Sequence, residues 1–167
     1  EQSILQRAAA AVLSGGMSGR LFTEVREKRG LCYAVHAIYV GQRERGAMFS
    51  YAGTTTPRAQ ETLDVMTSEL MRLAEGVGPD EFERAKVGMK SRLVMQGEST
   101  AARAAAIAAD QYTRGRPRTL SEMADRVEAI TLPKLNAFLR DHPPGEMSVV
   151  TIGPSPLKMR QQTSNCQ

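Results

Sequence analysis

The chain changes from helical to extended periodicity within residues 16–35, which read GMSGRLFTEVREKRGLCYAV. The apolar residues of the first half recur at helical spacing, and we expect a helix over residues 17–28. Gly30 is expected to end this helix, because glycine accommodates the left-handed conformation that often closes a helix. The β-branched and aromatic residues that follow favour a strand over residues 31–40. The first predicted unit is therefore a helix joined to a strand through one glycine.

The predicted strand continues into a hairpin. Residues 41–46 are polar and predict a turn, and residues 47–54 predict the return strand. Simple alternation places Tyr33, Val35, Ala37 and Tyr39 on one face of the first strand, and Ala34, His36, Ile38 and Val40 on the other. Tyr39 and Tyr51 lie on opposite strands, and we expect them to pack across the hairpin.

The remaining sequence is mostly helical. Helices are expected over residues 3–14, 57–74, 79–97, 100–113, 120–129 and 132–140, with a last strand over 147–153. Helices, a hairpin, more helices and a strand in that order predict an α+β fold. We expect one domain over residues 1–155 and a polar, flexible tail over 156–167. Three strands make a thin sheet for this many helices, so a further strand is expected upstream of Glu1.

Composition excludes several classes of protein. The 167 residues suit a single domain, and 41% hydrophobic with 24% charged residues exclude general disorder. No apolar run approaches the ~20 residues that span a bilayer. The net charge of +4 is spread along the chain without a basic patch interleaved with aromatics, so nucleic-acid binding is not expected. The chain begins with Glu1 and has no signal-peptide pattern, which suggests an excised or processed piece of a longer protein.

Histidine and cysteine are too sparse for a metal site. His36 and His142 lie far apart, and neither has the second histidine of an H-E-x-x-H or H-x-x-E-H motif. We expect His36 to be a core or interface residue and His142 a surface one. Cys32 and Cys166 exclude a disulfide framework and a zinc ribbon, and they leave the compartment open, periplasm or cytoplasm. Cys32 is expected to be a buried thiol on a strand.

The pattern of residues 16–35 resembles a signature of the pitrilysin/insulinase family of zinc metallopeptidases, which includes mitochondrial processing peptidase and many bacterial zinc proteases. The usual family form is close to G-G-G-M-S-S-R-L-F-x-E-V-R-E-K-R-G-L-x-Y-x-V. The match is ungapped, and Gly19 stands where serine is usual. Weaker similarity extends over about residues 3–155. The resemblance implies an antiparallel sheet with helices packed on one face, as in the metallohydrolase domains of mitochondrial processing peptidase.

The resemblance also implies a function. Family members pair a domain that carries H-x-x-E-H and zinc with a related metal-free domain, often called the inactive domain. The metal-free domain contributes an arginine and a tyrosine in an R-x-x-x-x-x-x-Y arrangement, and Arg26 and Tyr33 have that spacing. A neutral tyrosine phenol can donate to a developing oxyanion, and arginine can bind peptide carbonyl oxygens. The resemblance thus implies accessory catalytic roles for Arg26 and Tyr33, no metal in this chain, and zinc in a partner domain of the same polypeptide or of a partner subunit.

Other interpretations compete with this one. Outside the family, Arg26 is a solvated or ion-paired helix residue and Tyr33 a core aromatic with a hydrated hydroxyl. The same family also contains members without peptidase activity that serve as assembly modules, and an intact H-x-x-E-H in the partner distinguishes the two functions. A nucleic-acid protein is the third hypothesis, and it requires binding that weakens steeply with salt.

Structural interpretations cover the other polar and small residues. Arg20 and Glu24 are four apart on the predicted helix and are expected to pair. Arg29 is expected to act as a cation at the end of that helix. The alanine-dense residues 101–109 predict a close helix–helix contact, and RGRPR at 114–118 predicts a solvated loop.

Overall fold

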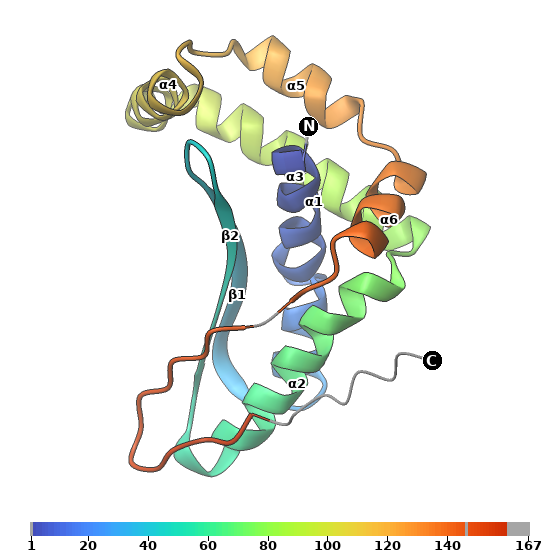
Figure 1. Ribbon diagram of the computed structural model, residues 1–167, viewed down its shortest axis with the longest axis vertical. Coiled ribbons are helices and arrows are strands. Elements are labelled where there is room, and N and C mark those ends of the chain that lie inside the picture. Colours follow the sequence, from blue (N-terminus) through green and yellow to red (C-terminus); the bar gives the residue numbers. More distant parts are fainter. Residues whose placement is uncertain (1, 146, 160–167) are drawn as a thin grey trace.

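The computed structural model describes residues 2–145 and 147–159 and has the expected α+β architecture (Figure 1). Its elements follow the chain as α1 (Gln2–Ser14), η1 (Phe22–Glu27), β1 (Cys32–Gly41), β2 (Gly46–Thr54), η2 (Thr56–Arg58), α2 (Ala59–Met71), η3 (Arg72–Glu75), α3 (Pro79–Glu98), α4 (Thr100–Arg114), α5 (Leu120–Glu128) and α6 (Leu132–Asp141). The α helices and the hairpin are those that the sequence predicts, with ends within a few residues of the expected positions.

The two strands form one antiparallel hairpin whose inner face is covered by helix α1. Val35 and Ala37 of β1 turn toward the core, and the Ala37 N–H donates to the Ser14 hydroxyl at 2.6 Å. This hydrogen bond fixes the end of α1 against the middle of β1. The outer face keeps its large side chains accessible, because Ile38 and Phe49 remain 48% and 56% exposed. The prediction of a sheet with helices on one face is therefore confirmed.

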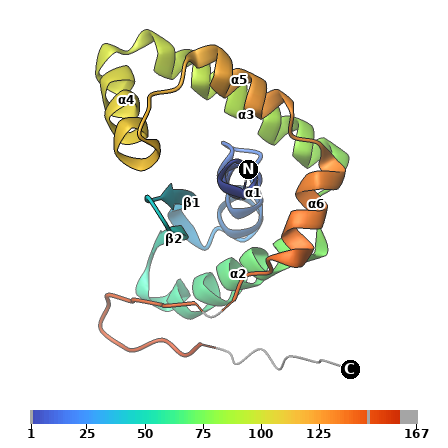
Figure 2. The same ribbon diagram turned by 45° about the horizontal axis from the view of Figure 1, so that its top comes forward.

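Helix α1 is the centre of the fold. In Figure 2 the hairpin lies on one side of α1, and α2, α6, α5 and α3 form an arc around its other sides. Contacts of α1 with β1, α3 and α6 bury residues all around the helix, among them Leu5, Val12 and Leu13. Alanines at positions 8–11 keep the helix narrow, and this lets its neighbours approach closely.

The predicted helix starts are confirmed by their capping groups. The Thr119 hydroxyl accepts the Glu122 N–H at 3.1 Å, and the Glu122 carboxylate accepts the Thr119 N–H at 2.7 Å. This reciprocal pair is the capping box that the sequence predicts. Thr131 caps α6 through the Lys134 N–H, and Pro79 occupies the first turn of α3.

The prediction of a strand over residues 147–153 is wrong. These residues run as an extended segment without strand pairing, and Val150 and Ile152 are 88% and 100% exposed. A strand requires a neighbour for its backbone hydrogen bonds, and no described strand lies beside this segment. The first part of the predicted tail is tied to α2, because Gln60 exchanges two hydrogen bonds with the backbone of Lys158. The rest of the tail, 160–167, lies outside the described residues.

Helix α4 exposes the alanine-dense segment that was predicted to pack closely against another helix. The side chains of residues 103–109 are all exposed, so the alanine-dense segment does not form the predicted close helix contact. Figure 1 shows α4 beyond the end of α3 and away from α2 and α6. The loop at 114–118 is solvated as predicted, since residues 114–117 are exposed. Its last residue, Arg118, binds the buried Asp110 through its Nε and Nη2 at 2.8 and 2.7 Å. That ion pair closes the 114–118 loop onto the end of α4.

Candidate functional site at the helix–strand junction

Arg26 lies on a short π-helix rather than on the α-helix predicted over residues 17–28. Residues 15–19 form a turn packed against the end of α1, where a Cβ at Gly19 would lie 2.7 Å from the Leu13 carbonyl oxygen. This turn delays the helix until Arg20, and the helix then widens over Phe22–Glu27. Single π-helical turns occur often at functional sites, because they shift side chains from α-helical positions.

Gly30 joins the π-helix to β1 as the sequence predicts. Its φ of +59° is in the left-handed region, which favours glycine. The Gly30 N–H donates to the Arg26 carbonyl at 3.0 Å, and the Leu31 N–H donates to the Val25 carbonyl at 2.9 Å. These two hydrogen bonds end the helix and start the strand within a few residues. The junction therefore separates Arg26 from Tyr33 by a single tight turn.

A β-bulge turns Tyr33 to the outer face of the hairpin. Cys32 pairs with Thr54 and Ala34 pairs with Gly53, so the register shifts by one residue at Tyr33. The shift places Tyr33 on the same face as His36, whereas simple alternation predicted opposite faces. The Tyr33 side chain is 66% exposed, so the alternative interpretation as a core aromatic is wrong.

The outer face around Tyr33 contains two further ring systems. His36 pairs in register with Tyr51, and their ring centroids lie 5.3 Å apart. The pKa of Tyr51 is raised, first by its charge interaction with Tyr33 and second by a hydrogen bond between these two side chains. Tyr39 instead lies opposite Met48, so the predicted packing of Tyr39 against Tyr51 is wrong. Tyr33, Tyr51 and His36 thus form an exposed ring cluster on the outer face.

Arg26 is exposed and lies close to the start of β1. Its guanidinium carbon is 5.0 Å from the centre of the Phe22 ring, a cation–π distance. Its charge also acts on the Cys32 thiol, where burial raises the pKa and Arg26 lowers it to a smaller extent. Cys32 is a buried free thiol, as predicted, and it directly precedes Tyr33.

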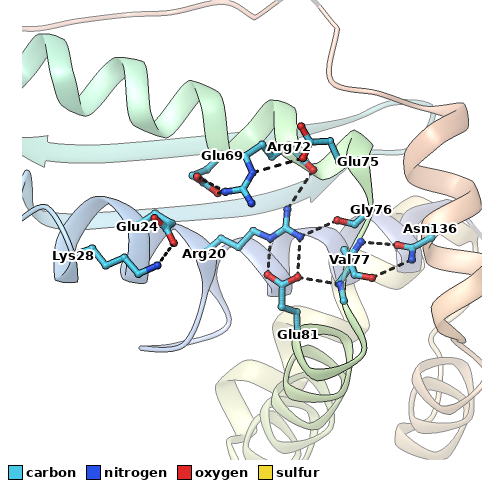
Figure 3. Close-up of polar contacts among 11 residues, drawn as sticks. Arg20, Glu24, Lys28, Glu69, Arg72, Glu75, Gly76, Val77, Glu81 and Asn136 are labelled. Atoms are coloured by element: carbon cyan, nitrogen blue, oxygen red, sulfur yellow. Dashed lines mark hydrogen bonds and ion pairs between the residues drawn. The ribbon is translucent and has the colours of Figure 1, made fainter.

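The charged residues around Arg26 pair differently from the prediction (Figure 3). Arg20 binds Glu81 of α3 rather than Glu24, with Nε to Oε1 at 2.7 Å. Glu24 instead accepts from Lys28 at 2.7 Å, as Figure 3 shows. It also accepts from Arg29 at 2.8 Å. Arg29 also donates to the Glu24 carbonyl at 2.6 Å, which confirms its role as a cation at the helix end. The Lys28 and Arg29 hydrogen bonds are the main cause of the lowered pKa of Glu24.

The part of the chain that the structure describes contains no group of three or more His, Cys, Asp or Glu side chains that could hold a metal ion. His36 is exposed on the outer face of the hairpin, so it is not a core residue, and its place at an interface stays a prediction. His142 is exposed at the end of α6 and stacks on Phe138 with ring centroids 4.4 Å apart. Among the same described residues, no helix is long and apolar enough to cross a membrane.

Tyr51 and Gly53 belong to this site but were not among the predicted functional residues. They share the outer face of β2, two positions apart, and Gly53 faces the bulge at Tyr33. In the sequence alone, Tyr51 is explained by packing across the hairpin and Gly53 is an ordinary glycine in a strand. Only the register of the hairpin brings them beside Tyr33, and the bulge that sets this register has no distinct sequence pattern here.

Comparisons with known proteins agree with the signature at residues 16–35. A family model described as "Peptidase M16 inactive domain" matches residues 1–89. The chain is 30% identical over 145 residues to the uncharacterized zinc protease YmxG of Bacillus subtilis, and 34% identical over 143 residues to the uncharacterized zinc protease SCO5738 of Streptomyces coelicolor. These alignments cover 86% and 85% of this chain but only 36% and 31% of the two relatives.

Solved structures show the same fold. A peptidase M16 inactive domain from Pseudomonas fluorescens superposes with a TM-score of 0.67 at 22% identity, over 83% of this chain and 33% of that one. A chain of complex III from Candida albicans superposes with a TM-score of 0.74 at 19% identity, over 84% of this chain and 36% of that one. The family model and the two relatives thus assign the chain to the inactive domains of the metallopeptidase class. Specifically, the chain belongs to the peptidase M16 inactive-domain family, which confirms the resemblance stated above.

Proposed function

We propose that this chain is the metal-free half of a zinc metalloendopeptidase and completes the active site of a domain that carries H-x-x-E-H. The observation that carries the proposal is the outward position of Tyr33, which the β-bulge turns away from the core next to the junction that bears Arg26. The zinc-protease names of the two relatives support the same class of reaction. Because this chain spans about a third of those relatives, the metal-bearing domain is a further part of the polypeptide or a separate subunit.

Each side chain has a distinct part in peptide hydrolysis. Zinc in the partner domain would supply an activated water and polarise the scissile carbonyl. The Tyr33 phenol donates a hydrogen bond to the carbonyl oxygen as negative charge develops there. Arg26 binds substrate carbonyl oxygens with its forked N–H groups. Both residues would therefore act on the substrate, with Tyr33 acting mainly in the transition state.

The test is to reconstitute the assembled enzyme. The metal-bearing domain encoded with this chain is purified and mixed with it, and hydrolysis of a fluorogenic peptide substrate is followed. We expect each half alone to be inactive and the mixture to be active. Tyr33→Phe should lower kcat about a hundredfold, the usual cost of one oxyanion donor, with little change in KM. Tyr112→Phe, which removes a phenol that is 71% exposed on α4, is the matched control and should leave kcat unchanged.

An assembly module is the second candidate function, and the likeness to a chain of complex III favours it. In that case the mixture forms a stable complex by size-exclusion chromatography but hydrolyses no peptide. Activity in the mixture together with an unchanged kcat for Tyr33→Phe would leave the peptidase class standing and remove the assigned role of Tyr33.

A further inference from the structure

The ring of Tyr33 lies directly on Gly53 of the neighbouring strand. A Cβ built on Gly53 would be 2.6 Å from Tyr33 Cζ and 2.7 Å from Cε2, closer than real Cβ atoms approach other heavy atoms. Gly53 is buried although it belongs to the open outer face of the hairpin. The missing side chain at position 53 therefore provides the space that the tyrosine ring occupies.

Tyr51 confines the same ring from one side. Tyr51 and Gly53 are two positions apart on β2, so they lie on the same face of the sheet. The Tyr33 ring lies over Gly53, so the next side chain beside it on that face of β2 is Tyr51. The charge interaction of Tyr33 with Tyr51, which raises the pKa of Tyr51, agrees with this placement. His36, whose ring centroid is 5.3 Å from that of Tyr51, continues the row of rings along the hairpin.

We propose that Gly53 and Tyr51 are positioning residues that hold the Tyr33 phenol in one orientation on the outer face of the hairpin. An exposed tyrosine on a two-stranded hairpin otherwise samples several χ1 rotamers. Contact with the Gly53 backbone and with the Tyr51 side chain removes most of that freedom before substrate binds. A preoriented donor is worth more in catalysis than a mobile one, because no reorganisation is needed in the transition state. This catalytic consequence rests on the proposed function, whereas the positioning itself does not.

The decisive variant is Gly53→Ala, which fills the space under the ring. The φ of Gly53 is not in the left-handed region, so alanine suits the backbone and the new methyl group displaces the exposed Tyr33 ring. Gly46→Ala is the matched control on the same strand. Its Cβ would lie 2.6 Å from Tyr39 Cζ, so it displaces a tyrosine ring by the same contact at the other end of the hairpin.

The first measurement uses this chain alone, with ¹³C-labelled tyrosine rings followed by NMR. In the unmodified chain we expect nuclear Overhauser contacts between the Tyr33 ring and the Gly53 α-protons, and a Tyr51 pKa above its ordinary value. Gly53→Ala should abolish the contacts to the Tyr33 ring and return the Tyr51 pKa toward its ordinary value. Gly46→Ala should change neither. A contact between the Tyr33 ring and the α-proton of residue 53 that persists in Gly53→Ala, with an unchanged Tyr51 pKa, would overturn the proposal independently of any peptidase activity.

The second measurement uses the reconstituted peptidase of the preceding section. Gly53→Ala and Tyr51→Phe should lower kcat by up to about a hundredfold, the cost of misplacing a catalytic group by an ångström, with little change in KM. In a Tyr33→Phe background the same two changes should lower kcat no further, because they act through Tyr33. Losses that add to that of Tyr33→Phe would contradict the positioning role. If Tyr33→Phe alone leaves kcat unchanged, the proposed catalytic role of Tyr33 fails, while the NMR result still decides the positioning.

Discussion

Arg20 and Glu81, 61 positions apart, form a two-pronged ion pair that joins the start of the π-helix to the start of α3 (Figure 3). Arg20 Nε and Nη2 donate to the two Glu81 carboxylate oxygens at 2.7 and 2.8 Å, and Nη2 also donates to the Gly76 carbonyl at 2.8 Å. Glu81 in turn accepts the Gly78 N–H at 3.1 Å in the first turn of α3. The helix that carries Arg26 is thereby fixed to the helical layer rather than only to the hairpin.

Removal of Arg20 should destabilise the whole domain. The side chains of Arg20 and Glu81 are only 11% and 29% exposed, so Arg20→Ala leaves a carboxylate and a carbonyl without their donor. We expect the free energy of unfolding to fall by about 2 kcal/mol, the usual value for hydrogen bonds to charged groups. Urea denaturation followed by circular dichroism measures this loss. Arg20→Lys should recover only part of it, because an ammonium group lacks the guanidinium fork.

Arg116→Ala is the matched control for Arg20→Ala. Arg116 forms an ion pair with Glu122 at 2.9 Å, but the two side chains are 65% and 39% exposed. Exposed pairs contribute about 0–1 kcal/mol, so this variant should unfold at nearly the urea concentration of the unmodified chain. Equal losses in the two variants would mean that the Arg20 pair is no stronger than a surface pair.

The sequence alone predicts the α helices and the hairpin of this fold, but neither the unpaired state of residues 147–153 nor the contacts that complete the site. Helix starts follow from local groups such as Thr119 and Glu122, and the helix–strand junction follows from Gly30. The partner of Arg20 does not follow, because Glu24 lies at ideal helical spacing while Glu81 is distant in the chain. The outward position of Tyr33 depends on a one-residue bulge, and a shift of one residue reverses every face assignment in a strand.

Acid should weaken the domain through Asp110. Its pKa is lowered mainly by the hydrogen bonds from Arg118, with which it pairs at 2.7 Å, so the folded state favours the ionised carboxylate. This stabilisation is present above the ordinary aspartate pKa of about 3.9 and is lost as pH falls through that value toward the lower folded pKa. The difference in unfolding free energy between the unmodified chain and Asp110→Asn should therefore shrink below about pH 4. Urea titrations at a series of pH values measure it, and a difference that does not vary with pH would contradict the prediction.

The extended segment at residues 147–153 provides a direct test of the corrected fold. Val150 and Ile152 are almost fully exposed and have no strand beside them among the described residues, so they bury little surface. The double variant Val150→Ser, Ile152→Ser should change the free energy of unfolding by no more than about 0.5 kcal/mol, as for other exposed positions. Leu135→Ala, at a fully buried position in α6, should cost about 2–5 kcal/mol in the same urea assay. Val150 and Ile152 are two positions apart, so a strand would turn both side chains to the same face. If that face packed on the core, the double variant would lose about 1.5–3 kcal/mol for each of the two buried side chains.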